Sequence, residues 1–213
     1  FATDLGATMN SSIDFSETRV LIIDDEEFMR FVGYTKAQCD KFGAKIVLNT
    51  AVTKELLKAE KPDSLVIATG AVPEVPDIPG IDDKRVVNMF DIFTGKAKVG
   101  KKVVILGGSG AAISLALFII GKHEKDGDEN ASIAMIDTAP RFGLDVNPSY
   151  IWRYRLRLKR AKVRELTFGK IKEITDAGVH ADWTLFDKKT KTKEKFTDQV
   201  VEADTIILAN LVP

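Results

Sequence analysis

A glycine-rich turn between two apolar segments is the feature that most limits how this 213-residue chain can fold. Val103–Leu106 is too short for a buried helix, and it precedes the turn Gly107–Gly110, after which small and apolar residues continue to Phe118. That order predicts a buried parallel strand, a tight turn and a helix, as at the start of a dinucleotide-binding βαβ unit. Glycines let the backbone turn sharply and approach a pyrophosphate, and the N–H groups at the helix start face the anion.

The turn matches the pattern G-x-G-x-x-G in part. Gly107 supplies the first glycine, whereas Ser109 stands in the second position and Ala112 in the third. Alanine is accepted at the third position, but serine adds a hydroxymethyl group where the phosphates approach. We expect Ser109→Gly to tighten nucleotide binding, and Gly107→Val to abolish it while leaving the fold intact. The alternative is that the glycines serve packing alone. The candidate cofactor-binding residues of this loop are Gly107, Gly108, Ser109, Gly110, Ala111 and Ala112.

An acidic residue follows the next candidate strand, Ser132–Ile136, and it is Asp137. A carboxylate there can accept hydrogen bonds from the adenosine ribose and repel a 2′-phosphate, which favours NAD(H) or ADP over NADP(H). The polar insert Lys122–Asn130 explains why the spacing from the loop exceeds the usual distance of about twenty residues. Two alternatives stay open, because Arg141 could pair with a 2′-phosphate and Asp137 could simply cap a turn.

Composition excludes several classes of function. The chain has 31 Lys and Arg against 31 Asp and Glu, so no overall basic field attracts nucleic acid or an anionic membrane. The single cysteine, Cys39, and the two separated histidines argue against an intrachain disulfide and a metal site. The sequence shows no membrane-spanning apolar stretch and no signal peptide in Phe1–Ser16. We expect a cytoplasmic protein, and its start at Phe1 suggests a fragment or a processed product.

Hydrophobic periodicity predicts the remaining elements. The expected helices are Glu26–Phe42, Thr53–Ala59 and about Ser149 to Arg160. The other expected strands of the α/β part are Lys45–Asn49, Ser64–Gly70, Lys162–Leu166 and Asp204–Asn210. A small antiparallel meander is expected from Lys170–Thr175, Gly178–Phe186 and Lys195–Val201. The proline-rich stretch Ala71–Gly80 cannot be helical, and it predicts an ordered strap between layers. The predicted fold class is α/β, with a Rossmann-like three-layer dinucleotide-binding domain that carries the meander.

Three stretches resemble the C-terminal half of the old-yellow-enzyme-related flavin oxidoreductases, the group of 2,4-dienoyl-CoA reductase, 2-enoate reductase and trimethylamine dehydrogenase. They are Val66–Gly80, Val99–Ser114 and Ala203–Pro213. The resemblance implies a partial FAD-type domain in residues 1–88, an inserted NAD(P)-binding domain in residues 89–203, and a return strand to the FAD-type domain in residues 204–213. It also makes Ala68, Thr69 and Gly70 candidate cofactor-binding residues that flank the flavin.

The resemblance implies parts of the enzyme that this sequence does not supply. These are the first glycine loop of the FAD domain, the N-terminal flavin barrel with FMN, and a cysteine-rich iron–sulfur segment. The NAD loop of the group reads Gly-Gly-Gly-x-x-Gly-x-Glu, and here Ser109, Ala112 and Ser114 replace two glycines and the glutamate. The implied function is to bind NAD(H) and position it to reduce FAD, in the service of enoate or enoyl-thioester reduction. The alternative is a degenerate ADP-binding or structural module. No catalytic and no metal-binding residue is nominated.

Overall fold

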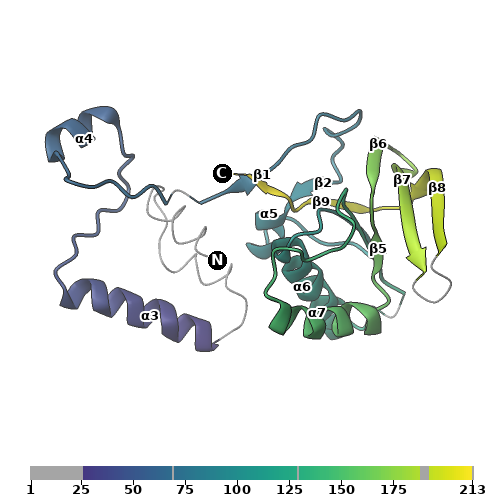
Figure 1. The fold of residues 1–213 in the computed structure, drawn as a ribbon, viewed down its shortest axis with the longest axis horizontal. Coiled ribbons are helices and arrows are strands. Elements are labelled where there is room, and N and C mark those ends of the chain that lie inside the picture. The colour runs from purple at the N-terminus through teal and green to yellow at the C-terminus, as the bar shows by residue number, and fades with distance from the viewer. Residues whose placement is uncertain (1–25, 69, 129, 188–191, 213) are drawn as a thin grey trace. The chain divides into compact units, whose positions relative to one another are not determined.

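The computed structural model describes residues 26–68, 70–128, 130–187 and 192–212 of the chain (Figure 1). The chain divides into two compact units, Phe1–Val72 with Pro213 and Pro73–Val212. The second unit contains the glycine-rich turn and Asp137, and therefore most of the predicted nucleotide-binding residues.

The described residues of the first unit form two helices where the sequence predicts them. Helix α3 spans Glu26–Lys41, and helix α4 spans Lys54–Glu60. Thr53 caps α4, because its hydroxyl accepts a hydrogen bond from the N–H of Leu56 at 3.2 Å. Such a cap satisfies one of the donors that a helix start leaves unpaired.

The two strands expected in the first unit are wrong. Neither Lys45–Asn49 nor the described part of Ser64–Gly70 forms a strand. A strand needs a neighbour to bind its backbone N–H and C=O groups, and no strand of the described residues pairs with residues 45–49 or 64–68. The apolar side chains that suggested a buried strand are open to solvent, with Val66 86% and Ile67 77% exposed.

The second unit is built on a five-stranded sheet in which every neighbouring pair is parallel. Its strands, in spatial order, are β2 (Val86–Asn88), β9 (Thr205–Leu208), β3 (Lys102–Leu106), β4 (Ser132–Ile136) and β5 (Arg164–Leu166). The chain steps outward from β3 through β4 to β5 and then returns with β9 on the other side of β3. Strands β1 (Val72–Pro73) and β10 (Leu211–Val212) form a separate two-stranded sheet.

The described residues of this unit form three helices: α5 (Met89–Phe93), α6 (Gly110–Asp126) and α7 (Pro148–Arg160). Helix α6 buries seven residues, and its Phe118 ring packs edge-on against Phe93 of α5, with the ring centroids 5.2 Å apart. Gly127 ends α6 in the left-handed conformation that favours glycine. Within the described ranges, no helix combines the length and the apolar character needed to cross a membrane.

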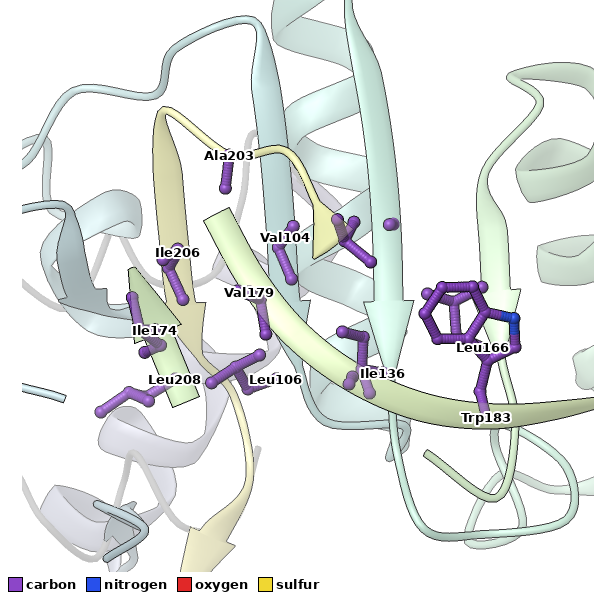
Figure 2. Packing of buried hydrophobic residues seen from close by; sticks show 13 residues of the cluster. Val104, Leu106, Ile136, Leu166, Ile174, Val179, Trp183, Ala203, Ile206 and Leu208 are labelled. Carbon is purple, nitrogen blue, oxygen red and sulfur yellow. The ribbon is translucent and has the colours of Figure 1, made fainter. Parts of the chain in front are cut away.

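The predicted antiparallel meander is confirmed as β6 (Lys170–Thr175), β7 (Gly178–Asp187) and β8 (Thr192–Val201). Its apolar side chains share one buried cluster with the parallel sheet, and Figure 2 shows Val179 of β7 and Ile174 of β6 beside Leu106 and Leu208. Because successive strand residues point to opposite faces, Val104 and Leu106 join this cluster while Val103 and Ile105 are buried on the other face. The three-layer α/β fold class is thereby confirmed.

The compact unit Pro73–Val212 includes residues 73–88 and 204–212 together with residues 89–203. Strands β2 and β9, which come from those outer stretches, pair with each other, and β9 pairs with β3. The assignment of the outer stretches to a separate FAD-type domain stays a prediction.

Candidate functional site

A crevice of about 240 Å³ lies at the carboxyl ends of β9, β3 and β4. From β3 the chain continues to β4 on one side, whereas β9 lies on the other side of β3, so the direction of strand order reverses between β3 and β9. Open parallel sheets bind ligands at the carboxyl ends of the strands beside such a topological switch point. The sheet side of the crevice is lined by Leu106, Gly107, Ile136, Asp137, Thr138, Leu208 and Asn210. The facing side is lined by Glu74, Pro76, Ile78, Gly169, Lys170 and Ile171.

Gly107 begins the turn that closes β3 at this crevice. Its φ of +144° lies in a region that side-chain-bearing residues rarely adopt. A Cβ on Gly107 would also lie 2.7 Å from Asn210 Oδ1 and 3.1 Å from the carbonyl carbon of Ala209. A side chain at Gly107 would therefore be strained, because residues 209–210 after β9 pass close to it, and we expect Gly107→Val to destabilise the fold.

Ser109 starts helix α6 as its N-cap. Its hydroxyl accepts a hydrogen bond from the N–H of Ala112 at 3.4 Å. Ser114, in the position where the related group has glutamate, donates its hydroxyl hydrogen to the carbonyl of Gly110 at 2.9 Å. Both serines thus bond to the backbone of α6 itself. The loop retains the strand–turn–helix geometry of a dinucleotide-binding loop, but its two serine side chains form hydrogen bonds within α6.

Asp137 follows β4 directly, as predicted, and it lines the crevice. Its Oδ1 accepts a hydrogen bond from the N–H of Ala139 at 2.8 Å, so the side chain caps a turn. Its backbone carbonyl accepts from the N–H of Gly169 at 2.7 Å, which draws the start of β6 toward the crevice. The turn-capping alternative is therefore realised, and the contact with a ribose stays a prediction.

A second carboxylate, Asp145, lies at the start of α6. Both of its oxygens are 2.9 Å from the N of Gly110, the first residue of the helix. Asp145 is not among the site residues predicted from the sequence. No local pattern could reveal the contact, because 35 residues separate the two partners.

The strap is held over the sheet by hydrogen bonds from both of its ends. The N–H of Glu74 donates a hydrogen bond to the carbonyl of Asn210, and the N–H of Ile174 donates one to the carbonyl of Pro79. Both N–O distances are 2.8 Å. Beyond the strap, the Arg85 guanidinium donates to the carbonyls of Thr175, Asp176 and Ala203 at 2.6–3.1 Å. These contacts bring Glu74, Pro76 and Ile78 to the crevice. The proline pattern predicted that the strap is ordered and runs between layers, but not that it lines the crevice.

The Arg85 guanidinium also binds the Asp83 carboxylate, with one pair of atoms 2.8 Å apart. This side-chain hydrogen bond lowers the pKa of Asp83 to about 2, and the same contact raises the pKa of Arg85. The pair is therefore charged throughout the physiological range.

The other predicted site residues lie elsewhere. Ala68 and Gly70 belong to the first unit, and Thr69 lies outside the described residues. Arg141, the predicted alternative partner of a 2′-phosphate, is exposed in the segment between β4 and α7. In the part of the chain that the structure describes, no three His, Cys, Asp or Glu side chains come close enough to hold a metal ion.

Residues 9–210 match the sequence profile of a family described as pyridine nucleotide-disulphide oxidoreductase. The chain belongs to this family. Among its curated relatives, a metal reductase of Desulforamulus reducens is 26% identical over 210 residues, which cover 86% of this chain and 30% of the reductase. A cinnamate reductase of Clostridium sporogenes is 35% identical over 77 residues, or 36% of this chain and 11% of that protein.

A solved structure of a 2-naphthoyl-CoA reductase with 2-naphthoyl-CoA matches 99% of this chain at 30% identity, with a TM-score of 0.70. The match covers 31% of that protein, so the chain spans under a third of the length of both this enzyme and the metal reductase. These matches confirm the resemblance to the FAD- and NAD(P)-binding half of old-yellow-enzyme-related reductases. The chain is thus a domain of the pyridine nucleotide-disulphide oxidoreductase family.

Proposed function

We propose that this chain binds NAD(H) in the crevice between β3 and β9 and positions it to reduce FAD within a larger flavoprotein. The observation that carries the proposal is the meeting of three features at one switch point. These are Gly107 in the turn after β3 and Asp137 after β4, which both line the crevice, and the start of α6 at Gly110, which follows the turn. In doubly wound sheets this is where a dinucleotide lies.

The residues present fit the ADP half of such a ligand. At the start of α6 the Asp145 carboxylate binds the N–H of Gly110, and a pyrophosphate would replace it there. Asp137 would accept hydrogen bonds from ribose hydroxyls at the neighbouring strand end. The strap residues Pro76 and Ile78 provide an apolar wall opposite the strand ends. Bound NADH would supply the hydride, and this chain would contribute binding, orientation and exclusion of water.

The chemistry served by the whole protein is inferred from its relatives. Their names point to a cinnamate, which is an enoate, and to an aryl-CoA thioester. We accordingly propose enoates or enoyl thioesters as the final electron acceptors. The same resemblance supports residues 1–88 and 204–213 as the FAD-type part and residues 89–203 as the NAD(P)-binding part. FMN, an iron–sulfur cluster and a flavin barrel would belong to other segments of the protein.

One observation favours the alternative, a degenerate module that holds ADP or has a structural role. The Asp145 carboxylate binds the Gly110 N–H, which is a group that a pyrophosphate would use. A module of this kind would gain no affinity from the nicotinamide half of the ligand.

Calorimetric titration of the chain with NADH, NADPH and ADP tests the proposal. We expect NADH to bind more tightly than either of the others, and Asp137→Ala to weaken NADH binding by about tenfold while affecting NADPH less. Asp126→Ala, an exposed carboxylate at the far end of α6, is the control and should change neither affinity. Equal affinities for ADP and NADH would favour the degenerate module, and tighter binding of NADPH would overturn the role of Asp137.

A further inference from the structure

The segment that carries Asp145 is fixed directly onto the glycine turn. The N–H of Gly143 donates to the carbonyl of Gly108 at 2.7 Å, and Phe142 is fully buried. The Phe142 ring packs so closely that a Cβ on Gly108 would lie 2.8 Å from its Cδ1. Arg155 of α7 donates to the carbonyl of Phe142 at 3.0 Å, which holds the segment from its other side.

This anchoring places Asp145 over the first residue of α6. A Cβ on Gly110 would lie 3.2 Å from Asp145 Oδ2 and 2.8 Å from a methyl group of Val146, so the absence of a side chain at Gly110 permits the approach. The hydroxyl of Ser109 already accepts from the N–H of Ala112 at the same helix end. The start of α6 therefore carries two acceptors from this chain, one of them charged.

A carboxylate and a pyrophosphate compete for such a position. Both are anions that bind the N–H groups and the positive end of the helix dipole. Two negative charges within hydrogen-bonding distance of one N–H repel each other. We infer that Asp145 is a displaceable anion in the pyrophosphate position, and that it lowers the affinity of the loop for diphosphates relative to uncharged nucleosides. The inference rests on the proposed function, since it assumes nucleotide binding at this loop.

The Asp145 side chain can move away from the Gly110 N–H while the residues that fix its segment, Phe142 and Asn147, stay in place. Asp145 is exposed, so water solvates its carboxylate once it moves away. Phe142 stays buried on one side, and on the other the Asn147 side chain caps α7 by accepting from the N–H of Ser149 at 2.8 Å. When a ligand diphosphate binds, the main free-energy cost is therefore the replacement of the Asp145 carboxylate by the phosphate at the Gly110 N–H.

Asp145→Asn removes the charge and keeps the shape and an acceptor oxygen. We expect the affinity of the chain for ADP to rise by at least about fivefold at low salt, the least that one like charge at about 4 Å would cost. The affinity for adenosine, which lacks phosphate, should stay unchanged. Asp126→Asn, which makes the same chemical change at the last residue of α6, should leave both affinities as they are.

Calorimetry with ADP and adenosine on the three proteins, together with their thermal melting curves, gives a decisive result. If wild type binds ADP and Asp145→Asn binds it no more tightly, the inference is overturned and the proposed function stands. An equal gain for adenosine would also overturn it, because the effect would then not depend on phosphate charge. If neither ligand binds any of the three proteins, the proposed function fails, and the inference fails with it.

Discussion

The ion pair between Asp83 and Arg85 gives a prediction about stability that can be worked from the structure. The folded-state pKa of Asp83, about 2, lies below its ordinary value of 3.8. A group whose pKa falls on folding stabilises the fold in its ionised form. The shift corresponds to about 2.5 kcal/mol before solvent screening, since one pKa unit is worth about 1.4 kcal/mol. Both side chains are mostly shielded from water, at 17% and 20% exposed, so solvent screening removes only part of this.

The sign of the pH dependence follows from the direction of the shift. The stabilisation by Asp83 is fully present above pH 4 and is lost as the pH falls toward 2. We expect Asp83→Asn to lower the free energy of unfolding by about 2 kcal/mol at pH 6 and to have little effect at pH 2. Its neighbour Asp82 is exposed, and Asp82→Asn is the matched control that should follow the wild type at both values.

Urea unfolding of the three proteins at pH 6 and pH 2, followed by circular dichroism, measures these differences. Comparing each variant with wild type at the same pH cancels the titration of all other groups. If Asp83→Asn were destabilised equally at both pH values, the ion pair would not be the source of the stability, and the reasoning would be refuted.

Three further predictions concern the loop and the cofactors. Gly107→Ala should lower the free energy of unfolding by about 1–3 kcal/mol, because of its positive φ and the nearby Asn210; an unchanged urea midpoint would contradict this. Ser109→Gly should cost only a few tenths of a kcal/mol of stability, and calorimetry should show tighter NADH binding. Weaker binding would show that the lost helix cap matters more than the room gained for the phosphates. The purified chain should be colourless, since it supplies one glycine loop only, and stoichiometric flavin absorbance would disprove that.

The second unit could be predicted from the sequence because its signals are local and agree with one another. Apolar runs such as Val103–Leu106 and Ser132–Ile136 are buried on both faces of a parallel sheet, and the turn after β3 reads directly from its glycines. The alternation of the meander likewise predicted β6, β7 and β8. In the first unit the same apolar signal failed, because Val66 and Ile67 have no strand beside them among the described residues.

The candidate site was predicted only where it is continuous in sequence. The turn and Asp137 follow their strands directly, so their meeting at one sheet edge follows from parallel topology. Asp145 and Lys170 reach the site from distant segments, and the strap does so through single backbone hydrogen bonds. Such contacts depend on tertiary packing, which periodicity does not encode.

Amide hydrogen exchange with and without NADH tests the central claim most directly, because it locates the ligand on the chain. We predict that millimolar NADH slows exchange most strongly at residues 107–112 and 137–139, around the turn and the end of β4. Adenosine should protect the end of β4 but leave the start of α6 unchanged, since it lacks the pyrophosphate. Protection confined to other segments, or none at all, would contradict a dinucleotide site at the β3–β9 switch point.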